Sequence, residues 1–106
     1  MEIRHQVRDE RGAERWPVLI NVSLRTDDGS NLSAKVTDIS ANGLRLKTYH
    51  SLEAGKRVFI SIPLLGEAPA TIVWNAKDTY GVVFDRPLPY RQLDELVLRY
   101  PPSFRR

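Results

Sequence analysis

The residues best suited to chemistry lie in one short stretch that contains Asp38, Ser40 and Gly43. An alternating polar and apolar run leads into this stretch and another leaves it, so it joins two strands. On an extended chain, residues two apart point to the same side, so Asp38 and Ser40 would present their oxygens together. Gly43 lacks a Cβ, so its backbone can turn with positive φ or let another group approach closely. The pattern favours a hydrogen-bonding site, although Asp and Ser at a strand end also commonly cap a turn.

A second cluster lies upstream, where Arg11 and Arg15 supply two guanidinium groups that no core position explains. Guanidinium is a planar fork of donors that pairs with carboxylates and phosphates. A ligand with polar edges and negative charge would therefore suit both clusters together. The segment 1–16 that carries the arginines is rich in charge and poor in apolar side chains. We expect it to be a flexible arm, with a short solvated helix as the alternative.

Other kinds of chemistry have little support. The chain has no cysteine, which excludes disulfides, thiolate metal sites and cysteine nucleophiles. Neither His5 nor His50 belongs to a cluster with metal-ligand spacing. A combination of Ser40, His50 and Asp38 lacks the context of a nucleophile elbow. We therefore expect neither an enzyme nor a resident metal or cofactor.

The segments around these residues alternate with a period of two, which is typical of strands with one buried face. The expected strands cover residues 17–26, 32–37, 44–47, 57–63, 68–75 and 79–85. Six strands at spacings of roughly eight to twelve residues predict an antiparallel barrel, in which closure leaves no long unpaired edge. Trp74 and Phe84 fall on the faces assigned to the core, so a stacking role for Trp74 would require it to lie at the rim.

The period changes to that of a helix near the C-terminus. One helical face would carry Leu93, Leu96, Val97 and Tyr100. Pro89 is tolerated near the first turn, and Pro101 and Pro102 would end the helix. We therefore expect an all-β fold with one helix: a six-stranded barrel over 17–100, closed at one end by a helix at about 89–100. A tail, 101–106, follows.

Length and charge limit the choice of partners. The 106 residues suit a single domain with one core. The net charge is +3 with acids and bases interleaved, so no dense basic patch points to DNA or RNA. A barrel that binds single-stranded nucleic acid would need exposed aromatic residues, for which Phe59 and Tyr80 are candidates. No apolar run suits a membrane span or a secretion signal, so we expect a cytoplasmic protein without membrane insertion.

The two clusters together resemble the motifs of the PilZ domain family, receptors for the bacterial second messenger cyclic di-GMP. The family has RxxxR before the first strand and (D/N)xSxxG between the second and third strands. Here these motifs are Arg11–Arg15 and Asp38–Gly43. The runs 70–74 and 80–84 also resemble family sequences, and the resemblance covers about residues 8–100. It implies a six-stranded barrel with a C-terminal helix, which the alternation pattern predicts independently.

The resemblance also implies a ligand, cyclic di-GMP, and a set of binding residues: Arg11, Arg15, Asp38, Ser40 and Gly43, with Arg8 and Asn42 in second rank. In this interpretation the arm becomes ordered over the ligand, and the changed surface signals to an unidentified downstream protein. Many family members have another arginine directly before RxxxR, where this chain has Glu10. The alternative is therefore a PilZ-like protein-interaction module that binds no nucleotide.

Overall fold

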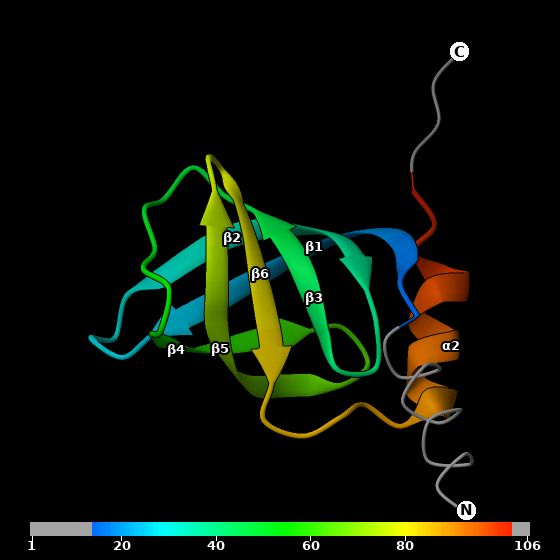
Figure 1. The fold of residues 1–106 in the computed structure, drawn as a ribbon. Helices are drawn as coiled ribbons and strands as arrows, with labels where there is room; N and C mark the ends of the chain where they lie inside the picture. Colours follow the sequence, from blue (N-terminus) through cyan, green and yellow to red (C-terminus); the bar gives the residue numbers. More distant parts are fainter. Residues whose placement is uncertain (1–13, 103–106) are drawn as a thin grey trace, which may run out of the picture.

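A computed structural model describes residues 14–102 as a closed barrel with one helix at its end (Figure 1). Its elements are β1 (Trp16–Thr26), β2 (Asn31–Ile39), β3 (Gly43–Lys47), β4 (Arg57–Ile62), β5 (Gly66–Ala76), β6 (Thr79–Phe84) and α2 (Tyr90–Arg99). The strands close in the order β1-β2-β3-β6-β5-β4, and every neighbouring pair is antiparallel. The predicted fold class is confirmed, and the observed element bounds differ from the predicted ones by no more than two residues. The predictions for the arm and the tail concern mainly residues 1–13 and 103–106, which lie outside the described residues.

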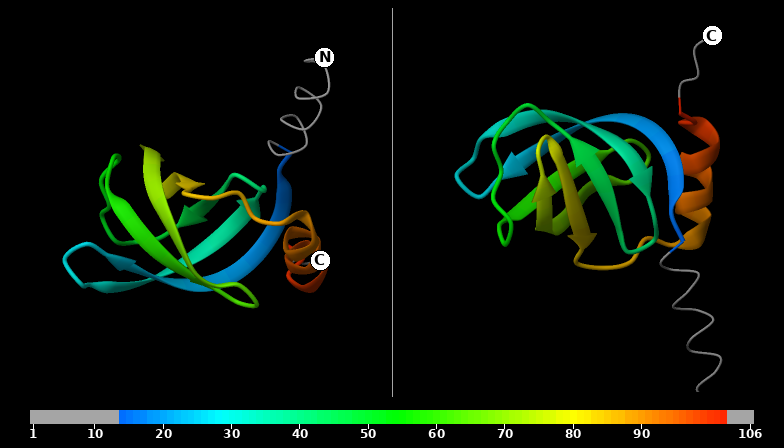
Figure 2. Two further views of the ribbon diagram at one scale, coloured as in Figure 1. Left: turned by 90° about the horizontal axis from the view of Figure 1, so that it is seen from below. Right: turned by 45° about the horizontal axis from the view of Figure 1, so that its top comes forward.

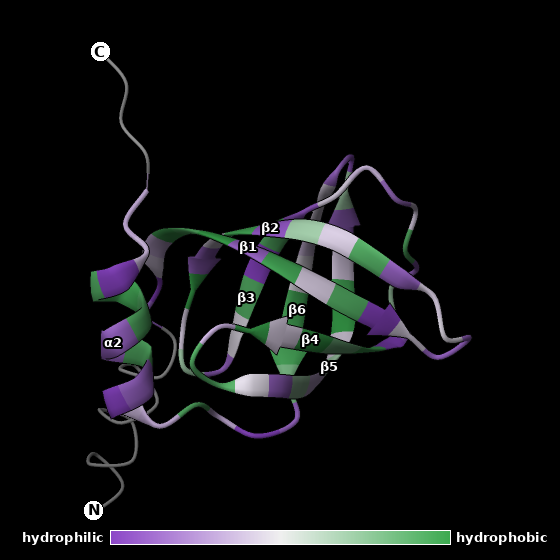
Figure 3. Ribbon diagram, turned by 180° about the vertical axis from the view of Figure 1, so that it is seen from behind, coloured by the Kyte–Doolittle hydropathy of each residue, from purple (hydrophilic) through white to green (hydrophobic). Residues whose placement is uncertain are grey.

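The core is filled by the inward-facing members of each alternating strand. In β1, each of the four inward residues between Val18 and Leu24 is at most 7% exposed, while Asn21 and Ser23 between them face solvent. Branched side chains such as these pack well on a pleated surface. Figure 3 shows the resulting alternation of hydrophobic and hydrophilic residues along the strands. Because the order of strands closes, each of the six described strands has a neighbour on both sides.

The turn between β1 and β2 follows its local chemistry. The carboxylate of Asp28 accepts hydrogen bonds from the Thr26 hydroxyl and the Ser30 N–H, and these bonds lower the pKa of Asp28 to about 2. Gly29 has φ of +89°, a conformation that glycine adopts without steric cost. The Asp-Asp-Gly-Ser sequence of residues 27–30 thus forms the hairpin turn that joins β1 to β2.

Helix α2 covers one end of the barrel, beside the start of β1 (Figures 1 and 2). Its buried residues are Leu93 and Leu96, which are 2% and 0% exposed. The N–H of Leu19 in β1 donates to the carbonyl of Tyr100 at 3.0 Å, which fixes the end of the helix to the barrel. Within the described range, no helix has both the length and the apolar character that a membrane crossing requires.

We predict that Leu96→Ala lowers the free energy of unfolding by about 2–5 kcal/mol, because it removes a fully buried side chain and leaves a cavity under the helix. Urea denaturation followed by circular dichroism measures this loss. The matched control is Leu98→Ala, which truncates a leucine that is 78% exposed on the same helix and should change stability by less than about 0.5 kcal/mol. Equal effects of the two variants would contradict the docking of α2 on the barrel.

Candidate functional site

Trp74 lies on the outside of the barrel, so the prediction that it fills the core is wrong. The pairing of β5 with β6 shifts register between Ile72 and Trp74, which marks a β-bulge. Ile72 is 1% exposed and faces the core, whereas Val73 and Trp74 are 47% and 37% exposed. The extra residue in β5 therefore turns Trp74 outward. Phe84, the other aromatic residue assigned to the core, is 6% exposed as expected.

The indole of Trp74 lies against the backbone of β6 at Gly81. These two residues are cross-strand partners, and a Cβ added at Gly81 would come 2.1 Å from the indole Nε1. Any side chain at position 81 would therefore displace the ring. Aromatic residues that cover a glycine on the opposite strand are a known way of stabilising antiparallel sheets. Here the same packing presents an indole at the surface.

Four residues form one row across the outer face of β2, β3, β6 and β5. Asp38 pairs with Arg45, Arg45 pairs with Gly81, and Gly81 pairs with Trp74. The Arg45 guanidinium carbon is 5.8 Å from the centroid of the Trp74 ring, and its Nη1 is 3.6 Å from Asp38 Oδ2. We call Asp38, Arg45, Gly81 and Trp74 the outer row. It joins a carboxylate, a guanidinium and one exposed indole, over which the guanidinium lies.

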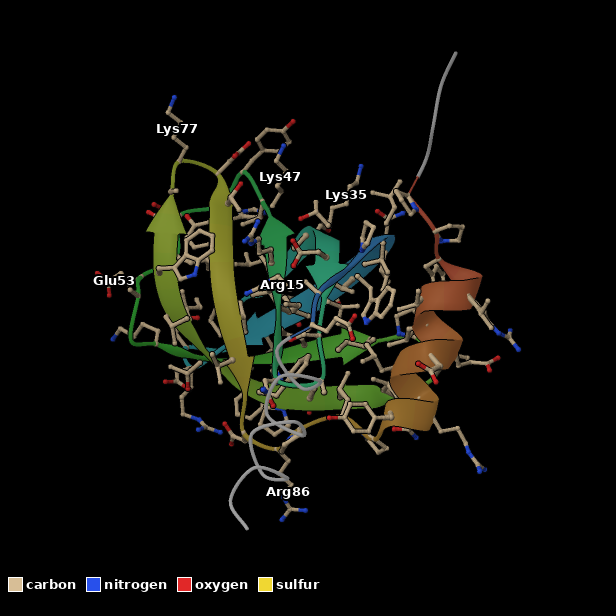
Figure 4. The ribbon with its side chains drawn as sticks, turned by 45° about the vertical axis from the view of Figure 1, so that its right-hand side comes forward. Arg15, Lys35, Lys47, Glu53, Lys77 and Arg86 are labelled. Atoms are coloured by element: carbon tan, nitrogen blue, oxygen red, sulfur yellow. The ribbon has the colours of Figure 1, made fainter. Side chains whose placement is uncertain are left out.

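Arg15 extends the outer row at the Asp38 end. Its Nη1 donates to Asp38 Oδ1 at 2.7 Å, and the two side chains are 41% and 18% exposed. The contact follows from the register of β1, in which Pro17 pairs with Asp38, so that the residues just before the strand lie beside the carboxylate. Figure 4 shows the labelled Arg15 in front of the strands, with Lys35 and Lys47 at the upper edge of the same view. The structure thus brings together Arg15 and Asp38, two of the predicted site residues.

Ser40 does not present its hydroxyl at the surface beside Asp38. It is 4% exposed, and its Oγ accepts hydrogen bonds from the N–H groups of Asn42 and Gly43 at 3.3 and 3.2 Å. The hydroxyl is also within donor distance of the Gly43 carbonyl, at 3.3 Å. Strand β2 ends at Ile39, so the extended geometry that would align Asp38 with Ser40 does not continue. The Ser40 hydroxyl therefore holds the turn, as in the capping alternative.

Gly43 is needed for a close approach between strands. A Cβ at this position would come 2.1 Å from the carbonyl oxygen of Val82 in β6, and Gly43 does not have a positive φ. The group that approaches Gly43 closely is thus the backbone of β6. Asn42 is exposed at the tip of the turn, and its carbonyl accepts a hydrogen bond from Phe84 N–H at 2.8 Å.

The structure also bears on the other predicted residues and on the alternative kinds of site. Arg8 and Arg11 lie outside the described residues. Tyr80 is 4% exposed and its hydroxyl bonds to loop residues His50 and Leu52, so it cannot stack on a nucleic acid base. Between residues 14 and 102, no three His, Asp or Glu side chains are grouped as metal ligands.

Sequence reasoning missed the roles of Arg45 and Gly81. The alternation of β3 indicates that Arg45 faces outward, but it does not reveal the neighbours of this residue. Those neighbours are set by the register of β3 with β2 and with β6, and β6 is distant from β3 in the sequence. The glycine opposite Trp74 would have been a signal only if the bulge in β5 had been known.

Comparisons with known proteins agree with this architecture. A family model described as the PilZ domain matches residues 4–100. The PilZ domain of CeSA from a cellulose synthesizing bacterium has a TM-score of 0.58 and 24% identity, over 82% of this chain and 93% of that chain. YcgR from Escherichia coli, solved in complex with c-di-GMP, has a TM-score of 0.62 and 17% identity, over 81% of this chain and 43% of that chain. At these identities the two structures establish the fold alone. No curated protein matches the sequence.

We predict that Gly81→Ala displaces the indole of Trp74 from β6. The new Cβ and the ring cannot occupy the same space, and the ring yields more easily than the backbone. The measurement is tryptophan fluorescence in a Trp16→Phe background, which leaves Trp74 as the single tryptophan of the two in the chain. The emission maximum should move to longer wavelength as the indole enters water. Val83→Ala, an exposed change on the same strand, is the control and should leave the emission unchanged. An unchanged emission in Gly81→Ala would contradict the packing described here.

Proposed function

The chain belongs to the PilZ domain family, and we propose that it is a receptor for cyclic di-GMP. The observation that carries this proposal is the outer row together with Arg15. On one exposed face it offers a carboxylate, two guanidinium groups and an indole. Cyclic di-GMP contains two guanines and two phosphates, and each kind of group has a chemical counterpart in this set.

Each side chain of the proposed site matches a particular chemical group of cyclic di-GMP. An ionised Asp38 accepts hydrogen bonds, which suits the N–H donors on a guanine edge. Arg15 and Arg45 suit phosphate oxygens and the O6 and N7 acceptors of guanine. The exposed face of Trp74 suits stacking of a base. In this proposal Ser40 and Gly43 act by holding the turn that positions Asp38 and Arg45, rather than by offering a free group.

The arm supplies the other half of the proposed site. Arg11, with Arg8 in second rank, would join Arg15 around the phosphates, and Asn42 would contribute from the tip of the turn. Ordering the arm costs conformational entropy, which charge-assisted hydrogen bonds of about 1.5–3 kcal/mol each offset. In the free protein Arg15 is paired with Asp38, so binding would transfer this arginine from the carboxylate to the ligand and free the carboxylate for guanine.

The proposed output is a change of surface. When Arg15 moves from Asp38 onto the ligand, the barrel face around the outer row differs from that of the free protein. A downstream protein that reads this surface would respond to the ligand. The receptor needs no catalytic step for this role, and we propose that it is not an enzyme.

We predict that Arg15→Ala weakens binding of cyclic di-GMP by roughly tenfold or more, because it removes at least one charge-assisted hydrogen bond. Such a bond contributes about 1.5–3 kcal/mol, and about 1.4 kcal/mol corresponds to a tenfold change in affinity. Isothermal titration calorimetry on the full chain measures affinity and stoichiometry. Arg99→Ala is the matched control, since Arg99 lies on α2 and pairs with Glu95 at 2.7 Å. Parent-like affinity in Arg15→Ala would rule out the assigned site.

The same titration tests the alternative function, a PilZ-like interaction module that binds no nucleotide. A ligand at a hundred times its dissociation constant stabilises a fold by about 2.7 kcal/mol, which a thermal melt detects easily. The absence of both heat and a thermal shift with cyclic di-GMP would therefore favour the alternative.

For a true complex, affinity should fall as salt rises, since the ligand is anionic and the arginines are exposed.

A further inference from the structure

A second charged surface on the barrel wall contains two lysines that face each other across β2 and β3. Lys35 and Lys47 are direct cross-strand partners, and both are exposed. Like charges in this position destabilise a sheet. Within residues 14–102, no carboxylate forms an ion pair with either lysine. No direct ion pair inside the described part of the chain thus offsets the repulsion, and an external anion would relieve it.

The lysines border a hollow with a volume of about 450 Å³. It is lined by Asn21, Ser33, Ala34, Lys35, Lys47, Thr48, Tyr49, His50 and Asp78. We call this the lysine hollow. Its polar groups include amide, hydroxyl and imidazole side chains as well as the two ammonium groups, and Asp78 contributes one carboxylate. The hollow is thus basic where β2 pairs with β3, and its other lining residues include polar, acidic and aromatic ones. Such a mixture is common on protein-binding surfaces.

An aromatic side chain stands fully exposed at the edge of the lysine hollow. Tyr49 is 100% exposed, yet its backbone is held on both sides. The Thr48 hydroxyl donates to the Ser33 carbonyl at 2.8 Å and accepts from His50 N–H at 3.2 Å, and the Thr48 N–H donates to the Asp78 carbonyl at 3.0 Å. A tyrosine presented from a fixed turn loses little entropy on binding, and tyrosine is enriched among residues that dominate protein interfaces.

We propose that the lysine hollow docks an acidic segment of a partner protein. Carboxylates of the segment would lie between Lys35 and Lys47, and an apolar side chain would pack on the ring of Tyr49. A nucleic acid is a poorer match because the charges of the chain are interleaved around a net of only +3, whereas nucleic-acid surfaces carry a denser basic patch. This inference does not depend on the binding of cyclic di-GMP. Figure 4 shows Lys35 and Lys47 at one edge of the barrel, with Lys77 farther along it.

The test is a titration of the full, ¹⁵N-labelled chain, without nucleotide, with a short capped peptide of glutamates around a central leucine. Nuclear magnetic resonance should show shifts confined to the lining of the lysine hollow. Lys35→Gln and Lys47→Gln should each weaken binding by about two- to fivefold, as expected for loss of one exposed charge pair. Arg86→Gln makes the same change in net charge far from the hollow, at the opposite end of the barrel in Figure 4, and should leave the affinity unchanged.

Three results would overturn the proposal. Shifts that are absent or spread over the whole surface would show that no docking site exists. Equal shifts from inorganic phosphate at the same ionic strength, or stronger ones from a short single-stranded oligonucleotide, would show a general anion or nucleic acid surface instead. A lower melting temperature for Lys47→Gln at low salt would contradict the repulsion between the lysines. Because cyclic di-GMP is absent from every arm of the test, none of these outcomes depends on the proposed receptor function.

Discussion

The close contact between β3 and β6 at Gly43 is the constraint on which the rest of the structure depends. Only a residue without a Cβ leaves room for the Val82 carbonyl, and this contact fixes the register of the two strands. A slip of one residue would exchange the two faces of β3 and turn Arg45 into the core. The Ser40 hydroxyl holds the turn that delivers Gly43 to this position. The turn residues thus determine where the charged side chains of the outer row stand.

Asp38 is the electrostatic centre of that row, and its two partners are held only loosely. Arg15 approaches the carboxylate from just before β1 and Arg45 approaches it from β3, and both side chains are more than 40% exposed. Exposed ion pairs of this kind contribute about 0.2–1 kcal/mol each, because water and salt screen them. A competing anion can therefore take over either arginine at small cost. The arrangement keeps the cationic groups close to one another without committing them to the carboxylate.

The barrel and its helix could be predicted from sequence because their signals are local. Alternation over 17–26 and 57–63, and a helical face from Leu93 onward, each report burial within a single element. Trp74 could not be placed, because its orientation depends on a bulge created by pairing with β6. The role of Ser40 depended on where β2 ends, and that of Arg45 on which strands flank β3. The position of the turn could thus be predicted from the sequence, whereas its role in binding and the positions of Arg8 and Arg11 stay predictions.

The outer row and the lysine hollow are neighbours on the same two strands. Arg45 and Lys47 are two residues apart on the outward side of β3, a separation of about 7 Å along the strand. This distance is within one Debye length at physiological salt, so charge bound at one site changes the potential at the other. An anionic nucleotide on the outer row would thus disfavour an acidic segment in the lysine hollow. By thermodynamic linkage the acidic segment would weaken nucleotide binding by the same factor. The barrel could then transmit a signal through electrostatic competition alone, without any change in its rigid core.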